Sequence, residues 1–395
     1  MTSQSLVPHI QGPTILQLIP TLETGGAERG TIEMAIAVKK AGGTPLVLSA
    51  GGRMVHELDR ADVRHILWPT IKSKNPLKIL ANAKKLAALL KEERVDLVHA
   101  RSRAPAWVGW RACKATGVPF MTTFHAAYNF GGRLKKWYNS VMASGARVIA
   151  ISGFIRQHIL DNYETDRGVI RLIHRGVDVA RFDPLLMKPD RFIKLQQFWR
   201  VPDGMSVVLL PGRLTRWKGQ RVLIEAMAQL KDLPIVAVCV GDDQGRSSYR
   251  KELDALIKER GLEGRVRLPG DCQDMPAAYA LASVVLSCSI EPEAFGRVII
   301  EAQAMGKPVI VSDIGAVAET AKAGGCGWTV PPKDPDALAQ AIRHVMTLPP
   351  AEHQRISQQA RAFVIDNYTA AQMAEKTLAV YNELLPGNKQ LSPNA

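Results

Sequence analysis

The sequence predicts an α/β protein built from two doubly wound parallel sheets. Short apolar segments alternate with helical patterns along most of the chain, which is the order that buried parallel strands and their covering helices produce. The alternation breaks at Phe182-Asp183-Pro184 and restarts near residue 207, which indicates a second sheet. The length of 395 residues agrees with this division, because it exceeds what one hydrophobic core ordinarily contains.

The first domain is expected to span residues 1–183. Helical patterns cover residues 76–93 and 152–162, between short apolar segments that read as buried strands. These predicted strands are residues 14–19, 46–49, 65–67, 97–100, 120–123, 147–150 and 169–173.

The second domain is expected to span residues 184–369. A helix is predicted over about 294–304, where Gly306 and Pro308 end it, and two or three more helices follow Pro335. The last of them covers about residues 370–385, and the polar tail 386–395 is predicted to be disordered. The predicted strands are residues 207–210, 235–240, 266–268, 284–286, 309–311 and 328–330.

Positive charge is concentrated in the first domain. Residues 1–183 hold 26 Lys and Arg against 14 Asp and Glu, a surplus of 12, whereas the remainder holds 25 against 23, a surplus of 2. An acidic membrane surface, a phosphorylated glycolipid or nucleic acid would be attracted to such a domain, and a merely solvated basic face is the plain alternative. The candidate surface comprises Lys72, Lys74, Lys78, Lys84, Lys85, Arg133, Lys135, Lys136 and Trp137.

Cysteine usage and hydropathy favour a cytoplasmic location. The five cysteines are odd in number and never closely spaced, which is typical of free thiols in a reducing compartment. The apolar runs are too short to cross a bilayer, and the N-terminus has no basic-then-apolar leader.

The most informative motif is a pair of carboxylates, Glu293 and Glu301, separated by seven residues. Glu293 is predicted at a loop-to-helix junction, where free backbone N–H groups and the helix dipole favour anionic ligands. Glu301 lies about two turns further along the same predicted helix. A carboxylate at the mouth and another deeper in the site suit a ligand with several hydroxyl groups and a phosphate, such as a nucleotide sugar.

Two cations follow the first strand of the second domain. Arg213 and Lys218 stand around a predicted strand-to-helix turn and could converge on a diphosphate. Two solvated surface cations are the alternative. Gly241 ends the next strand and fits a turn that faces a nucleotide.

Further candidates lie in the first domain and at its end. Gly25 and Gly26 follow the first strand and open a helix, so a phosphate or sugar could approach the backbone there. This turn lacks the third glycine of the dinucleotide-binding fingerprint. His125 follows a strand at the edge where α/β sheets bind ligands. Arg175, near the domain boundary, could contact substrate or simply belong to a turn.

Taken together, these motifs resemble the retaining nucleotide-sugar glycosyltransferases of family 4, and the resemblance covers essentially the whole chain. It implies the GT-B fold, in which two Rossmann-like domains face a cleft and the last helix, here 370–385, packs back onto the N-terminal domain. It also implies that neither a metal nor another cofactor is required. Residues 100–107, 211–220 and 291–296 are most similar to bacterial lipopolysaccharide-core mannosyltransferases.

The resemblance also implies a role for each motif. Glu301 would hold the donor ribose, Glu293 the hydroxyls of the transferred sugar, and the backbone of Phe295 and Gly296 the sugar or phosphate. Arg213 and Lys218 would stabilise the departing diphosphate. The resemblance also implies that His125 lies beside the reacting sugar and that Gly25 and Gly26 line the phosphate and acceptor side. Gly241 is expected on the donor side, and Arg101, Arg103 and Arg175 could recognise an acidic acceptor sugar or a lipid phosphate.

The function expected from the sequence is transfer of mannose from GDP-mannose to an anionic glycolipid of the lipopolysaccharide core, at the cytoplasmic face of the inner membrane. A UDP-sugar-dependent enzyme of exopolysaccharide or other glycolipid synthesis is the alternative. A nicotinamide-dependent dehydrogenase is disfavoured by the missing glycine fingerprint. A non-catalytic binder of anionic lipid or nucleic acid would leave the carboxylate pair unexplained, so nucleic acid is not expected as a partner.

Overall fold

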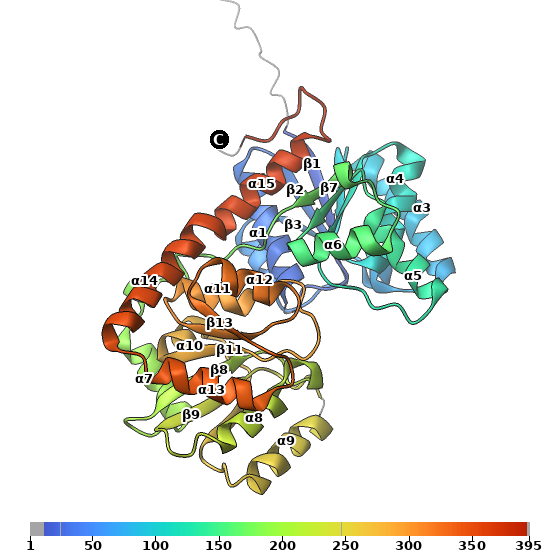
Figure 1. The fold of residues 1–395 in the computed structure, drawn as a ribbon. Helices are drawn as coiled ribbons and strands as arrows, with labels where there is room; N and C mark the ends of the chain where they lie inside the picture. Colours follow the sequence, from blue (N-terminus) through green and yellow to red (C-terminus); the bar gives the residue numbers. More distant parts are fainter. Residues whose placement is uncertain (1–11, 24, 246, 393–395) are drawn as a thin grey trace, which may run out of the picture. The chain divides into compact units, whose positions relative to one another are not determined.

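The computed structural model describes residues 12–23, 25–245 and 247–392. The chain forms two compact units, residues 1–174 with 372–395 and residues 175–371. Each unit contains one parallel sheet with helices on both faces, which confirms the predicted fold class. Figure 1 shows the elements of each unit.

Unit 1 is built on a seven-stranded sheet of order β3-β2-β1-β4-β5-β6-β7, and all its neighbouring strands are parallel. The order reverses between β1 and β4, so loops after these two strands diverge to opposite faces. The strands are β1 (Thr14–Leu18), β2 (Thr44–Ser49), β3 (Arg64–Leu67), β4 (Leu97–Ala100), β5 (Phe120–Phe124), β6 (Arg147–Ala150) and β7 (Ile170–Leu172).

Helices cover both faces of this sheet. On one face, α1 and the C-terminal helix α15 share a core in which Met34 and Tyr381 are buried. On the other face, Gly109 of α4 lies so close to β1 that an added Cβ would come within 2.7 Å of Leu18. The helices are α1 (Gly26–Lys40), α2 (Val55–Arg60), α3 (Pro76–Glu92), α4 (Arg103–Thr116), α5 (Arg133–Ser140), α6 (Gly153–Asn162) and α15 (Ala370–Asn382).

Unit 2 is built on a six-stranded parallel sheet of order β10-β9-β8-β11-β12-β13, with its own reversal between β8 and β11. The strands are β8 (Ser206–Pro211), β9 (Ile235–Val240), β10 (Val266–Gly270), β11 (Ala282–Ser287), β12 (Val309–Ser312) and β13 (Gly327–Val330). The helices are α7 (Pro189–Phe198), α8 (Gln220–Ala228), α9 (Ser247–Glu259), α10 (Met275–Leu281), α11 (Arg297–Ala304), α12 (Ala316–Ala323), α13 (Pro335–Met346) and α14 (Pro350–Asn367).

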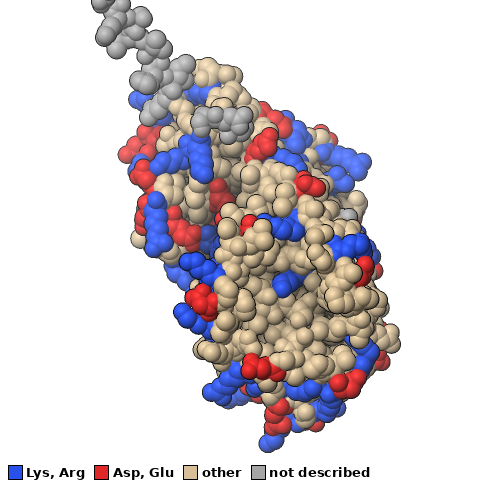
Figure 2. Space-filling model, turned by 90° about the vertical axis from the view of Figure 1, so that its left-hand side faces the viewer, with Lys and Arg blue, Asp and Glu red and all other residues tan. Residues whose placement is uncertain are grey.

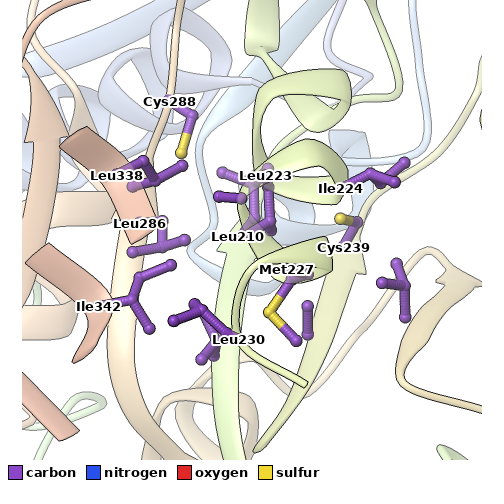
Figure 3. Packing of buried hydrophobic residues seen from close by; sticks show 14 of the residues in the cluster. Leu210, Leu223, Ile224, Met227, Leu230, Cys239, Leu286, Cys288, Leu338 and Ile342 are labelled. Carbon is purple, nitrogen blue, oxygen red and sulfur yellow. The ribbon is translucent and has the colours of Figure 1, made fainter. Parts of the chain in front are cut away.

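One core of unit 2 lies between its sheet and helices α8, α9 and α13. Figure 3 shows Leu210 and Leu286 of the strands packed between Leu223 of α8 and Leu338 of α13. These four side chains are at most 2% exposed. Burial of each such side chain stabilises the fold by roughly 2 kcal/mol, so this layer fixes β8 and β11 relative to α8.

The units divide after His174, whereas the sequence placed the boundary at Asp183. Residues 175–183 pack with unit 2 because Val177 exchanges backbone hydrogen bonds with the chain near Thr369, and because Phe182 is buried against Tyr279. The break at Pro184 therefore ends a connecting segment rather than the first domain.

The prediction of a disordered tail from residue 386 is corrected over residues 386–392. Leu391 is 2% exposed and exchanges two hydrogen bonds with Asn382, while Lys389 pairs with Asp96 at 2.9 Å. The prediction rested on the polar composition of the tail, which did not indicate that Leu391 is buried against unit 1. Residues 393–395 lie outside the described part of the chain.

Four of the five cysteines are buried, and no disulfide joins them in the described residues. Burial raises the pKa of Cys239 to about 12. Within the described residues, we find no helix with both the length and the apolar content that crossing a membrane requires.

Candidate functional site

The candidate site of unit 2 is built on the loops that follow β8 and β11. These strands are neighbours at the reversal of strand order, which is where open α/β sheets bind ligands at the carboxyl ends of their strands. Lys218 lies in the loop after β8, and Glu293 lies in the loop after β11. The fold therefore brings together residues that are 75 positions apart in sequence.

Gly219 sets the approach of the two loops. It adopts a left-handed conformation with φ of 75°, and a Cβ at this position would lie 1.8 Å from the carbonyl oxygen of Cys288. The backbone N–H of Ile290 also donates to the carbonyl oxygen of Trp217 at 2.8 Å. Only glycine allows this close contact, so it fixes the position from which the Lys218 side chain extends.

Three donors converge on one oxygen of Glu293. Lys218 Nζ donates to Oε1 at 2.7 Å, Ser287 Oγ donates to the same atom at 3.0 Å, and Ser289 Oγ also donates to it. The Glu293 side chain is 9% exposed. Among the described residues, Oε2 of Glu293 accepts no hydrogen bond. The carboxylate is thus anchored through Oε1 and retains accepting capacity at Oε2.

Glu293 is held in its ionised form. Burial opposes ionisation, but the charge of Lys218 and the hydrogen bonds from Lys218, Ser289 and Ser287 outweigh it, so the pKa of Glu293 lies below its ordinary value. A buried carboxylate that stays charged near neutral pH is an acceptor for ligand hydroxyl groups and a poor proton donor.

Glu301 is oriented by two other side chains. Arg297 Nε donates to Oε1 at 2.9 Å across one helical turn, and Tyr279 Oη donates to Oε2 at 2.9 Å from α10. Tyr279 is fully buried, and burial followed by the nearby Glu301 charge raises its pKa well above the ordinary value. The tyrosine therefore remains a hydrogen-bond donor, and it fixes the direction of the Glu301 carboxylate.

The helix that carries Glu301 begins later than predicted. Gly296 takes a left-handed conformation with φ of 81°, and a Cβ there would lie 2.2 Å from Cγ1 of Val317. Because this conformation interrupts the helix, α11 starts at Arg297 and Glu293 lies in the preceding loop. Glu293 instead forms an isolated β-bridge with Gly315, while Phe295 is buried beside the turn.

Arg213 extends from the same loop as Lys218 and is exposed. Its Nη1 donates to Gln244 Oε1 at 3.4 Å. A Cβ added to Gly212 would meet Cδ of Lys218 at 3.4 Å, so the lysine side chain passes over the backbone next to Arg213. Gly241 packs against this loop, since a Cβ there would lie 2.2 Å from the Gly212 carbonyl oxygen.

In unit 1, the predicted site residues follow β1, β4 and β5, which are neighbours in the sheet. Gly25 and Gly26 are exposed at the start of α1, which has no side-chain cap in the described residues. His125 is partly buried after β5. Burial, followed by the nearby Arg101 and His125, lowers the pKa of the fully buried His99.

The three arginines expected near the acceptor differ in accessibility. Arg101 is 3% exposed and donates Nε to Gln17 Oε1 at 2.8 Å, which places its guanidinium inside unit 1. Arg103 is partly exposed, lies over the Tyr128 ring and donates to Asn139. Arg175 is 5% exposed at the start of unit 2. Their acceptor roles stay predictions.

Sequence reasoning missed four supporting residues: Tyr279, Ser287, Ser289 and Arg297. The spacing of Arg297 and Glu301 by four residues on a predicted helix could have indicated their ion pair. The two serines alternate at the end of β11, but nothing in the sequence marks Tyr279 as a partner of Glu301. Among the described residues, no three His, Cys, Asp or Glu side chains group as a metal site.

Two family profiles match the two halves of the chain. The profile described as Glycosyltransferase Family 4 matches residues 24–181, and the one described as Glycosyl transferases group 1 matches residues 192–363. A solved glycosyltransferase from Rickettsia africae is 41% identical with a TM-score of 0.88, over 95% of this chain and 99% of its own. This chain belongs to the family 4 glycosyltransferases.

Two further relatives share a lower identity with this glycosyltransferase. Anabaena HepE, solved in complex with UDP and glucose, is 26% identical over 93% of this chain and 98% of its own, with a TM-score of 0.81. A curated D-inositol 3-phosphate glycosyltransferase of Salinispora tropica is 28% identical over 317 residues. That match covers 73% of this chain and 64% of the relative's length.

Proposed function

We propose that this glycosyltransferase transfers mannose from GDP-mannose, with retention of anomeric configuration, to an anionic glycolipid of the lipopolysaccharide-core type. The observation that carries the proposal is the anchored pair of Lys218 and Glu293 at the strand reversal of unit 2. The acceptor and the mannosyl donor follow from the narrower sequence resemblance. The place of action proposed with them is the cytoplasmic face of the inner membrane.

The donor would bind unit 2 through both carboxylates. Oε2 of Glu293 would accept a hydrogen bond from a hydroxyl of the transferred sugar. Glu301, whose oxygens already accept from Arg297 and Tyr279, has further lone pairs for the ribose hydroxyls. Backbone N–H groups at Phe295 and Gly296 would contribute to holding the sugar or phosphate.

Transfer requires stabilisation of a departing anion. The bond between the anomeric carbon and the diphosphate oxygen breaks, and a new bond forms to the acceptor hydroxyl oxygen. Arg213 and Lys218 would neutralise the nucleoside diphosphate as it leaves, and preorganised charge of this kind is usually the largest catalytic contribution. The acceptor proton would pass to the departing phosphate oxygen, so the step needs neither a metal nor a covalent bond to Glu293.

A screen of donors tests the proposal. Thermal unfolding is measured with GDP-mannose, GDP, UDP-glucose and UDP, because a ligand at 100 times its Kd stabilises the native state by about 2.7 kcal/mol. GDP-mannose is expected to give the largest shift and to be consumed when a lipid-linked core oligosaccharide is added. A dephosphorylated acceptor should react more slowly, and NMR of the product should show retention.

A UDP-sugar-dependent enzyme of exopolysaccharide or other glycolipid synthesis is the second candidate. It is favoured by the likeness to HepE, which was solved with UDP and glucose. Stabilisation by UDP-glucose without stabilisation by GDP-mannose would replace the first proposal with this one. Stabilisation by neither donor class would reject both.

A further inference from the structure

Unit 1 contains a long segment with cations and no acidic residue. Between Asp96 and Asp161 the sequence holds nine Lys and Arg residues and no Asp or Glu. Part of this segment is α5, whose first turn contains Arg133, Lys135 and Lys136, all exposed. By contrast, Figure 2 shows another face, on which acidic and basic side chains are interspersed. Most of the surplus positive charge of unit 1 therefore comes from this one segment.

Large apolar side chains are exposed beside these cations. Leu134 is 84% exposed and Trp137 is 59% exposed, and their spacing of three residues places them on the same side of α5. Phe130, just before the helix, is 36% exposed, and Lys136 Nζ lies 5.7 Å from its ring centroid. We call residues 130 and 133–137 the α5 patch.

The α5 patch is supported by packing against α4. Trp137 packs against Trp107 of α4 with ring centroids 4.8 Å apart, and Trp107 Nε1 donates to the carbonyl oxygen of Tyr138 at 2.9 Å. Asn139 is fully buried beneath the helix. Figure 1 shows α3, α4 and α5 together on one side of unit 1. This support leaves the outer side of α5 with nothing to pack against in the described chain.

The combination of side chains favours an anionic lipid surface as the occupant. Cations flanking an exposed Leu and Trp on a short helix are typical of helices that lie in a membrane interface, with the rings at headgroup level. The α5 patch contains no acidic residue, so its charge complements phosphate headgroups. A further apolar residue, Leu77, is 77% exposed beside Lys74 and Lys78 at the start of α3, which packs against α4.

We propose that the α5 patch is the membrane-docking element of this enzyme, inserting Leu134 and Trp137 among headgroups while Arg133, Lys135 and Lys136 contact lipid phosphates. The inference deepens the proposed function, because a lipid-linked acceptor is presented at such a surface. It does not require the donor to be GDP-mannose.

Vesicle co-sedimentation of the full chain tests the proposal. Wild type is expected to bind vesicles of phosphatidylglycerol and phosphatidylcholine, and to bind pure phosphatidylcholine vesicles at least about tenfold more weakly. The variant Leu134→Ser/Trp137→Ser should lower the partition coefficient about tenfold or more, because it removes the inserted apolar groups. The variant Lys135→Glu/Lys136→Glu should lower it similarly and abolish most of its salt dependence.

Matched controls come from unit 2. Leu185→Ser/Phe198→Ser removes apolar side chains that are 89% and 69% exposed, and Lys251→Glu/Lys258→Glu makes the same charge change on exposed positions of α9. Both controls should sediment with vesicles as wild type does. Failure of wild type to bind anionic vesicles would overturn the proposal, as would equal losses in the control and α5 variants.

Donor binding separates this proposal from the proposed function. Thermal stabilisation by the nucleotide sugar, measured without vesicles, should be the same in wild type and both α5 variants. Vesicle binding with no response to any nucleotide sugar would leave docking in place and reject the donor assignment. Nucleotide-sugar stabilisation with α5-independent vesicle binding would reject the docking element alone.

Discussion

Lys218 and Glu293 form one buried unit in which the lysine ammonium lies 2.7 Å from the carboxylate oxygen that two serines also contact. Their side chains are 14% and 9% exposed, so water screens the pair weakly. Lys218 therefore helps to keep Glu293 ionised in a partly dry site. A donor diphosphate arriving there would meet a lysine already oriented by the carboxylate, and a sugar hydroxyl would meet the free oxygen of Glu293.

Replacement of the lysine tests this coupling. Lys218→Met is expected to lower transfer about 10²–10³-fold, because a preorganised charge at the leaving group is lost. It should also destabilise unit 2 by roughly 3 kcal/mol, because a buried carboxylate loses its counter-ion. Steady-state kinetics and chemical unfolding measure the two effects.

The double variant Lys218→Met/Glu293→Gln separates stability from catalysis. It removes both charges, so most of the lost stability should return while transfer stays low. Lys251→Met, at an exposed position of α9, should match wild type in both measurements. Recovery of transfer in the double variant would show that the pair is structural only.

Gly219 supports the pair through backbone geometry. Gly219→Ala is expected to cost about 2 kcal/mol or more and to reduce transfer strongly, because the new Cβ would lie 1.8 Å from the Cys288 carbonyl oxygen and would push Lys218 away from Glu293. Thermal unfolding and kinetics check both results.

Gly245 provides the matched control for this change. It has the same φ of 75°, but an added Cβ would meet nothing within 4 Å. Gly245→Ala should therefore cost only the strain of a left-handed alanine, about 1 kcal/mol. Equal destabilisation by the two substitutions would mean that the contact with Cys288 contributes nothing.

The fold class followed from sequence because thirteen short apolar segments alternate with helical patterns, and each of these segments overlaps a strand. Local pattern could not place the unit boundary. Phe182 and Val177 belong to unit 2 through contacts with Tyr279 and the chain near Thr369, and such distant contacts leave no periodic signal. The burial of Leu391 was not predicted for the same reason, because one leucine in a polar tail forms no repeating apolar pattern.

Much of the candidate site was also predictable, because glycines and charges follow strand ends at sites of this kind. The ion pair between Lys218 and Glu293 was not predicted, because the sequence analysis assigned each residue its own contact with the donor. The start of α11 at Arg297 was missed because glycine is tolerated within helices, whereas here Gly296 is left-handed. The contact of Tyr279 with Glu301 depends on how α10 packs beside α11.

Tyr279 is expected to act as a positioning residue. Tyr279→Phe keeps the buried ring but removes the hydrogen bond to Glu301, so it should cost about 1 kcal/mol of stability. Donor affinity should fall several-fold, raising KM more than it lowers kcat, because Glu301 is proposed to hold the ribose. Calorimetric titration with the donor checks affinity, and Tyr249→Phe, at a buried tyrosine of α9, should leave affinity unchanged. A fall in kcat at constant KM would contradict this role.

Glu383 predicts a specific acid dependence of unit 1. Arg171 donates Nε to Oε1 at 2.9 Å and Nη2 to Oε2 at 2.6 Å, and Arg147 also donates to Oε2. The hydrogen bonding from Arg171, with that from Arg147, lowers the pKa of Glu383 to about 2 against a smaller opposing effect of burial. This network joins the residue that follows α15 to β6 and β7.

The sign follows from proton binding. A glutamate with a folded pKa below its unfolded value, about 4.3, contributes its full stability above that unfolded value and loses it as the pH falls toward 2. Unfolding free energy of wild type should therefore decline between about pH 4.3 and 2 more steeply than that of Glu383→Gln. Glu375→Gln, at an exposed position on α15, serves as the control and should keep the wild-type slope. If the unfolding free energies of wild type and Glu383→Gln change in parallel with pH, the charge of Glu383 does not contribute to the stability of the folded state.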